Sequence, residues 1–182
     1  MRIIGGRFRG KSLSWVSNKT TRPTTDRVKE NIFNILTSMG VDFAASRVLT
    51  LFAGSGQIGI ECYSRGSTDL VFNDTSPEAV GIIQNNCESV GLKTAVITLD
   101  YLKCLEKLKG QVFDLVFLDP PFADTAAPGR AAEYLLNNGM LSDKAVIVAE
   151  TECGDLVFDG FSVRKKRYGR AVIYFLLTNK SK

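Results

Sequence analysis

The chain has 182 residues, of which 45% are hydrophobic, which is enough to bury the core of one ordinary domain and excludes a disordered chain. It contains no histidine, which excludes a Ser-His-Asp triad and a His-ligated zinc site. Its net charge of +4 is unevenly spread: residues 1–30 hold eight Lys/Arg against two acids, residues 164–182 hold seven against none, and the segment between them is acidic. This distribution predicts basic ends that contact a polyanion, although charged ends also occur merely as solvated termini. No apolar run reaches the length of a membrane span, so we expect a cytoplasmic protein.

The first motif along the chain, Gly5–Ser12, fits the G-x-x-x-x-G-K-S spacing of a phosphate-binding P-loop. Residues 115–119 add an apolar strand that ends in an aspartate, as in magnesium-dependent ATPases. A P-loop must lie between a buried strand and a helix, yet residues 13–18 suit a strand and a turn. We therefore expect a basic strand in a hairpin, with Arg7, Arg9 and Lys11 on one face, where they would contact a phosphate backbone.

A helix is predicted over residues 22–36, with Thr24 or Thr25 as its N-cap and an apolar side that includes Ile32 and Leu36. Residues 1–40 are thus expected to form a basic arm of hairpin and helix. Residues 41–182 would form the main domain.

From residue 48 onward, short β-branched or aromatic runs alternate with helical stretches. Strands are predicted at 48–52, 69–73, 95–99, 112–118 and 145–149, helices at 57–65, 76–90, 101–108 and 130–138, and a hairpin of strands 161–168 and 171–177 about Gly169. This alternation predicts an α/β fold whose mostly parallel, seven-stranded sheet is covered on both faces and ends in an antiparallel hairpin. In such folds ligands bind at the carboxyl ends of the strands.

A glycine motif, G-x-G-x-x-G, covers Gly54 to Gly59 after the first of these strands, and Asp74 lies twenty residues beyond Gly54. Glycines let the backbone approach a ligand, and the acid can accept hydrogen bonds from ribose hydroxyls. The pattern predicts a cofactor that contains adenosine, which leaves both NAD and S-adenosylmethionine open. Asp100, at the end of the third strand, is a candidate acceptor for the adenine amino group.

The tetrapeptide Asp119-Pro120-Pro121-Phe122 ends the fourth strand at the same edge. An exocyclic base amine is a poor nucleophile because its lone pair is delocalised into the ring. The Asp119 carboxylate and the Pro120 carbonyl could accept its two hydrogens, while Phe122 stacks on the extruded base. These features favour methyl transfer to an amine, the alternative being a strand-ending turn with one buried aspartate.

Four stretches together resemble the RsmD family of bacterial methyltransferases: residues 2–10, 22–30, 51–56 and 119–122. The resemblance covers nearly the whole chain. It implies a Rossmann-like class I fold and transfer of a methyl group from S-adenosylmethionine to N2 of one guanine in 16S ribosomal RNA of the small subunit or its assembly intermediate.

The resemblance also implies roles for individual residues. The catalytic, target-base residues would be Asp119, Pro120, Pro121 and Phe122. The cofactor-binding residues would be Phe52, Ala53, Gly54, Ser55, Gly56, Asp74, Thr75, Asp100 and Tyr101. The expected RNA-binding residues are Arg7, Arg9 and Lys11 of the basic segment, together with Arg22, Thr24, Arg27 and Arg167 of the family motifs, and no metal is expected.

Two positions depart from the family pattern, which usually has aspartate at position 50 and often has tyrosine at position 122. Here they are Thr50, which weakens one cofactor contact or loop-bracing bond, and Phe122, which keeps the stacking plane without the hydroxyl. Arg167-Tyr168-Gly169 matches the family, within a basic segment that could touch RNA.

We expect direct transfer of the methyl group without a covalent enzyme intermediate, since the spacing of the four scattered cysteines indicates reduced structural thiols. Three alternatives remain: an amino methyltransferase for adenine N6 in DNA or RNA, an NAD-dependent oxidoreductase, and an RNA chaperone that kept an adenosine pocket. The oxidoreductase lacks a histidine or a Y-x-x-x-K pair to handle a hydroxyl proton. A monomer is expected.

Overall fold

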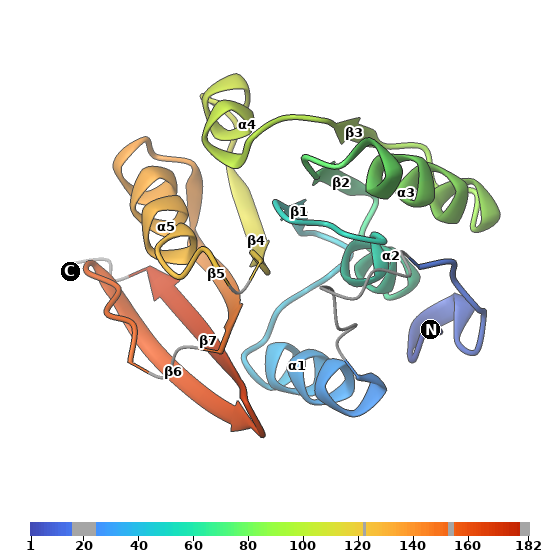
Figure 1. Ribbon diagram of the computed structural model, residues 1–182. Helices are drawn as coiled ribbons and strands as arrows, with labels where there is room; N and C mark the ends of the chain where they lie inside the picture. The colour runs from blue at the N-terminus through green and yellow to red at the C-terminus, as the bar shows by residue number, and fades with distance from the viewer. Residues whose placement is uncertain (16–24, 122, 153–154, 179–182) are drawn as a thin grey trace.

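Alternating strands and helices build one seven-stranded sheet between two layers of helices (Figure 1). The computed structural model describes residues 1–15, 25–121, 123–152 and 155–178. The strands are β1 (Arg47–Thr50), β2 (Asp69–Asn73), β3 (Ala95–Ile97), β4 (Phe113–Leu118), β5 (Leu141–Thr151), β6 (Phe161–Tyr168) and β7 (Ala171–Thr178). The helices are α1 (Asp26–Ser38), α2 (Gln57–Ser64), α3 (Pro77–Ser89), α4 (Tyr101–Lys107) and α5 (Ala127–Asn137), and a short 3₁₀ helix, η1, covers Gly6–Phe8.

The sheet has the strand order β3-β2-β1-β4-β5-β7-β6. Strands β1 to β5 are parallel, and β7 runs antiparallel to both β5 and β6. The predicted class, a mostly parallel sheet with a C-terminal antiparallel hairpin, is confirmed. Because the chain fills the sheet outward from β1 in one direction and then from β4 in the other, the order reverses between these two neighbours. Open α/β sheets bind their ligands at such a reversal.

Both faces of the central part of the sheet are buried, and the side chains of each central strand divide between them. In β4, Val116 belongs to the core formed with α4 and α5, while Leu115 belongs to the core formed with α1, α2 and α3. This period-2 division explains why the strands read as continuous apolar runs rather than alternating ones. Within the described ranges, no helix has both the length and the apolarity needed to cross a membrane.

Helix starts follow local capping chemistry. The Ser76 hydroxyl accepts from the Ala79 N–H at 3.3 Å, and the Thr25 hydroxyl accepts from Val28, as predicted for these N-caps. Helix α5 begins three residues earlier than predicted, because the Asp124 carboxylate accepts from the Ala127 N–H at 3.1 Å. Strand β5 is longer than predicted and β3 ends two residues earlier.

The basic strand predicted within Gly5–Ser12 is wrong, although the chain does reverse there. Residues Gly6–Phe8 form η1, and an isolated antiparallel bridge joins Arg2 to Ser12. Gly6 has a φ of +73°, and a Cβ at this position would lie 1.9 Å from the backbone oxygen of Ser64. Ser64 also donates to the Gly5 carbonyl and accepts from the Phe8 N–H, so the end of α2 closes the turn.

The N-terminal segment shares the core of the sheet. Ile3, Leu13 and Phe33 are buried in the same cluster as residues of β1 and β4. The fully buried Lys29 donates from Nζ to the Arg2 carbonyl at 2.6 Å. A boundary at residue 40 stays a prediction, and the two segments pack against each other across it.

Close packing of α2 on β2 generates a stability prediction. A Cβ on Gly59 would lie 2.4 Å from Cε1 of the fully buried Phe72, so Gly59→Ala should overpack the core and lower the free energy of unfolding by about 1–3 kcal/mol. Gly81→Ala in α3 is the matched control, because a Cβ there meets nothing within 4 Å. It should raise the free energy of unfolding by about 0.5–1 kcal/mol through helix propensity. Urea unfolding measures both, and equal stabilisation by the two substitutions would contradict this packing.

Candidate active site at the carboxyl edge of the sheet

The glycine loop between β1 and α2 has a backbone that glycine adopts more readily than other residues. Gly54 and Gly56 have φ values of +57° and +78°. The loop is fastened by hydrogen bonds from the Ala53 N–H to the Asn73 carbonyl at 2.9 Å and from the Gly56 N–H to the Ala53 carbonyl at 2.7 Å. The predicted Gly54, Ser55 and Gly56 therefore form a turn at the head of a helix, where a ligand can approach the backbone.

Asp74, the predicted ribose acceptor, braces this loop. Its Oδ2 accepts from the Gly54 N–H at 2.8 Å and its Oδ1 accepts from the Ser76 N–H at 2.9 Å. The residue is half-buried at the end of β2. An ionised carboxylate can accept about four hydrogen bonds, so Asp74 keeps capacity for two hydroxyls while it orients the loop.

Asn73, which no sequence motif singled out, joins three strand ends. Its Nδ2 donates to the carbonyls of Leu51 at 2.9 Å and Leu99 at 3.0 Å, and its Oδ1 accepts from the Leu99 N–H at 3.3 Å. The side chain is buried with both polar atoms satisfied, so it holds the loops after β1 and β3 beside Asp74. The signal that could have found it was an amide at the last position of an apolar strand.

Asn86 was missed as well, and it connects the glycine loop to the N-terminal segment. Its Nδ2 donates to the carbonyls of Ser14 and Ser55, and its Oδ1 accepts from the Ser14 N–H, all at 2.9 Å. Asn86 lies on the otherwise apolar face of α3 with Ile83 and Cys87. A polar residue in that apolar stripe was the signal in the sequence.

Asp100 and Tyr101, which follow β3, lie in different surroundings. Asp100 is exposed and caps α4, where its Oδ1 accepts from the Leu102 N–H at 3.0 Å. Tyr101 is buried and its ring packs on that of the predicted contact residue Phe52, with centroids 5.2 Å apart. Thr75 is exposed beside Asp74. An adenine contact by Asp100 stays a prediction.

Asp119 lies at the same edge as the glycine loop, because it follows β4 and β4 pairs directly with β1. The Leu51 N–H donates to the Phe117 carbonyl at 3.1 Å just before the two loops diverge. Pro120 is buried, whereas Pro121 is exposed and its carbonyl accepts from the Asp124 N–H. Phe122 lies outside the described residues. The cofactor loop and the candidate target-base loop thus follow two neighbouring strands, β1 and β4, at the point where the strand order reverses.

The surroundings of Asp119 raise its affinity for a proton. Desolvation by surrounding protein, and then the nearby charge of Glu150, raise the pKa of Asp119 well above its ordinary value. The Leu118–Ala149 pairing between β4 and β5 explains this proximity, since the next residue on each strand is an acid. Asp119 is nevertheless an exposed residue, so a substrate can reach it. A carboxylate with a raised pKa is a better proton acceptor than an ordinary surface aspartate.

Thr50 and the three described cysteines are structural. The buried Thr50 hydroxyl donates to the Val71 carbonyl at 3.3 Å and so ties β1 to β2 just before the glycine loop. Burial raises the pKa of Cys87 to about 11 and that of Cys104 to about 12, and it also raises the pKa of Cys62. These three thiols are therefore protonated near neutral pH and are not nucleophiles. Cys153 lies outside the described residues.

The described members of the predicted RNA-binding set do not form one cluster. Arg7 stacks over the Tyr63 ring at 4.1 Å from the centroid, and Lys11 donates from Nζ to the Ser89 carbonyl. Tyr63 and Ser89 lie near the ends of α2 and α3, at the edge where the parallel strands begin. Arg9, close to Arg7 in the chain, is exposed.

The remaining members of that set lie elsewhere. Arg27 is in the first turn of α1, and Arg167 is exposed near the end of β6. Arg22 and Thr24 lie outside the described residues. No role of these residues in RNA binding follows from position alone, and each stays a prediction.

Comparison with known proteins places the chain in a family. The family model described as "Conserved hypothetical protein 95" matches residues 1–177. The chain is 36% identical over 178 residues to "Putative rRNA methyltransferase YlbH" of Bacillus subtilis, covering 93% of this chain and 94% of that protein. It is 35% identical over 155 residues to "Ribosomal RNA small subunit methyltransferase D" of Escherichia coli strain K12, covering 84% and 75%.

Solved structures agree. "Putative methyltransferase yhhF from Escherichia coli" has a TM-score of 0.85 and 30% identity, covering 100% of this chain and 99% of that one. A more distant structure, "SMU.776, a putative methyltransferase complexed with SAH", has a TM-score of 0.61 and 12% identity, covering 82% of this chain and 49% of that one, and so shows similarity of fold alone. The chain therefore belongs to the family described as Conserved hypothetical protein 95, the RsmD family, and has the class I methyltransferase fold.

Proposed function

We propose that the protein transfers a methyl group from S-adenosylmethionine to the exocyclic N2 amine of a guanine in 16S ribosomal RNA of the small ribosomal subunit. One observation carries the proposal: the glycine loop braced by Asp74 and the Asp119-Pro120 segment leave the adjacent strands β1 and β4 at the same edge of the sheet. Relatives named as ribosomal RNA methyltransferases, the small-subunit enzyme among them, support RNA as the substrate.

The residues at the glycine loop fit the proposed cofactor. Turns at Gly54 and Gly56 leave backbone accessible for its methionine part, and the Asp74 carboxylate can accept from ribose hydroxyls. Phe52, supported by Tyr101, offers an apolar surface beside the adenosine position. When bound, S-adenosylmethionine supplies a methyl group on a positively charged sulfonium. The related structure solved with SAH, though distant in sequence, agrees with a cofactor of this type on this fold.

At the neighbouring loop, the protein's task is to orient and activate an amine. The Asp119 carboxylate and the Pro120 carbonyl accept the two N–H bonds, which turns the nitrogen lone pair toward the methyl donor. As the N–C bond forms and the S–C bond breaks, the nitrogen becomes more acidic, and its proton leaves to Asp119 or to water. Holding Asp119 at a raised pKa suits it for that step.

The second candidate is methylation of adenine N6, because the same two acceptors would fit any exocyclic base amine. One assay separates the candidates. Small subunits from cells that lack the modification are incubated with the protein and methyl-labelled cofactor, and the RNA is digested to nucleosides. Labelled N2-methylguanosine is the expected product. N6-methyladenosine would replace guanine by adenine in the proposal, and no incorporation would refute an rRNA methyltransferase.

Asp119→Ala should separate chemistry from cofactor binding. Loss of the acceptor should lower kcat by about 100-fold or more, whereas the Kd for S-adenosylhomocysteine should change by less than about threefold, because Asp119 belongs to the other loop. Asp159→Ala, which removes an exposed carboxylate elsewhere, is the control and should keep full activity. Single-turnover methylation measures the rate of methyl transfer, and calorimetric titration measures the Kd for S-adenosylhomocysteine. Undiminished activity of Asp119→Ala would remove this residue from the mechanism.

Asp74→Asn should have the opposite signature. The amide cannot accept through both of its ends, so one of the two backbone bonds, to Gly54 or to Ser76, is lost together with the negative charge. We expect the Kd for S-adenosylhomocysteine to rise about 10-fold or more, as for loss of one charge-assisted hydrogen bond. Calorimetric titration checks this, with a thermal melt to show that the variant is folded. Unchanged affinity would mean that the carboxylate touches neither loop nor ribose in the bound state.

A further inference from the structure

The protein has two basic extensions, and they lie at opposite edges of the sheet. One is η1 with the neighbouring Arg9, and the other is the turn between β6 and β7, here called the C-terminal hairpin turn (residues 167–170). Strands β1 to β5 are parallel, so the edge at which they end is the site's edge and the edge at which they begin is its opposite. Which extension shares the site's edge can be read from the registers.

The C-terminal hairpin turn lies at the site's edge. Strand β7 runs antiparallel to β5, and its second residue pairs with Thr151 at the end of β5, so β7 begins where β5 ends. Leu118 pairs with Ala149, so the residues that follow them, Asp119 and Glu150, lie at the same height along the strand direction. Ile173 pairs with Glu150, and Arg170 lies three residues beyond that level, or about 10 Å at the rise of an antiparallel strand. The turn therefore projects past the site.

Its geometry holds cations outward. Tyr168 pairs with Ala171, which leaves Gly169 and Arg170 as a two-residue turn, and Gly169 has the positive φ of +62° that such a turn needs at its first position. Arg167 and Arg170 are exposed. Within the described ranges neither makes an ion pair, whereas Lys165 on the same hairpin pairs with Asp155 at 3.1 Å. Both guanidinium groups are thus accessible to a ligand.

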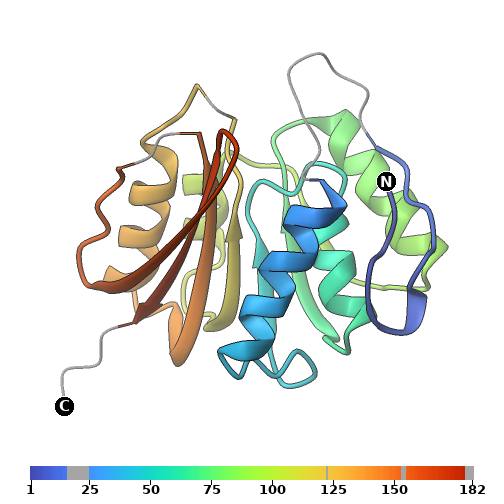
Figure 2. The same cartoon turned by 90° about the horizontal axis from the view of Figure 1, so that it is seen from below.

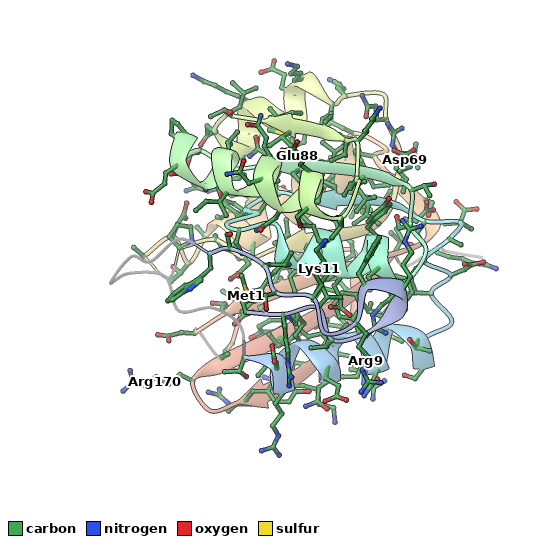
Figure 3. All side chains as sticks on the ribbon, turned by 90° about the vertical axis from the view of Figure 1, so that its right-hand side faces the viewer. Met1, Arg9, Lys11, Asp69, Glu88 and Arg170 are labelled. Atoms are coloured by element: carbon green, nitrogen blue, oxygen red, sulfur yellow. The ribbon has the colours of Figure 1, made fainter. Side chains whose placement is uncertain are left out.

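The other extension, η1 with the neighbouring Arg9, is here called the N-terminal turn and lies at the opposite edge. It contacts Tyr63 and Ser64 near the end of α2, and α2 runs from the glycine loop back toward the start of β2. Figure 2 shows this blue turn and the red turn of the β6–β7 hairpin at opposite edges. In Figure 3, Arg170 lies at one side of the molecule, whereas Arg9 lies toward the other side, with Asp69 at the start of β2.

We propose that the C-terminal hairpin turn, through Arg167 and Arg170, binds the phosphate backbone of the ribosomal RNA next to the target nucleotide, and that Arg9 and its neighbours, for which the sequence also predicts RNA contacts, do not. The inference rests on the proposed function. Guanidinium groups bind phosphate oxygens in bidentate fashion, and a projecting turn at the site's edge meets the strand on either side of an extruded base. Arg7 and Lys11, in contrast, already contact Tyr63 and the Ser89 carbonyl within the protein.

The test compares equal charge losses at the two edges. Arg170→Ala and Arg9→Ala each remove one exposed cation, and the double variants Arg167→Ala/Arg170→Ala and Arg7→Ala/Arg9→Ala remove two. The substrate is the small subunit from cells that lack the modification, and kcat/KM is measured from about 50 to 200 mM salt, a range over which phosphate binding weakens strongly. S-adenosylhomocysteine affinity and a thermal melt accompany each variant.

Arg170→Ala should lower kcat/KM about threefold to tenfold, and the hairpin double variant more, with unchanged S-adenosylhomocysteine affinity. The slope of log kcat/KM against log salt should become shallower by about 0.7–0.9 for each phosphate that the variant no longer neutralises. Arg9→Ala should change kcat/KM by less than about twofold and leave the slope as it is. Equal or larger decreases with Arg9→Ala, or wild-type behaviour of both hairpin variants, would overturn the inference and leave the proposed function intact. Wild-type protein that methylates no subunit would instead refute the proposed function.

Discussion

The reversal of strand order between β1 and β4 is the constraint on which the site depends. Two parallel neighbours end at the same edge, and their following segments turn to opposite faces of the sheet, β1 toward α2 and β4 toward α5. Side chains and backbone from both segments therefore line the space where they part. Methyl transfer needs one loop to hold the donor and another to hold the acceptor, and this topology supplies the two side by side.

Three polar side chains, two of them buried, turn this topology into a defined geometry. Asn73 ties the ends of β1 and β3 together, Asp74 fixes the amide of Gly54, and Asn86 joins the glycine loop to the N-terminal segment. Each is satisfied by backbone groups, so none carries the cost of an unpaired buried polar atom. The glycine loop is thus held from several directions while its own backbone stays open to a ligand. Loops positioned by a rigid scaffold are where proteins commonly place binding residues.

Local patterns in the sequence predicted what depends on local chemistry. The strand and helix alternation, the N-caps at Thr25 and Ser76, and the hairpin about Gly169 all follow from residues close together in the chain, and all are confirmed. The glycine loop and Asp74 were also recognisable, because their spacing encodes a turn between a strand and a helix.

The prediction of an extended strand within residues 5–12 was wrong, because the close approach of Gly6 to Ser64, far away in the chain, determines the backbone conformation there. Long-range hydrogen bonds likewise hid Asn73 and Asn86, whose backbone partners lie 22 to 72 residues away. The charge distribution predicts two cationic extensions, but only the strand registers place one at the site's edge, and only the contacts of η1 with α2 place the other opposite it.

The central claim is that donor and acceptor meet where the loops after β1 and β4 diverge, and a crystal structure with S-adenosylhomocysteine and a short guanosine-containing RNA tests it most directly. The account predicts the sulfur against the glycine loop, with the ribose at Asp74 and a guanine amine within hydrogen-bonding distance of Asp119. Ligand density at any other edge of the sheet, or a guanine separated from the sulfur by protein, would contradict it.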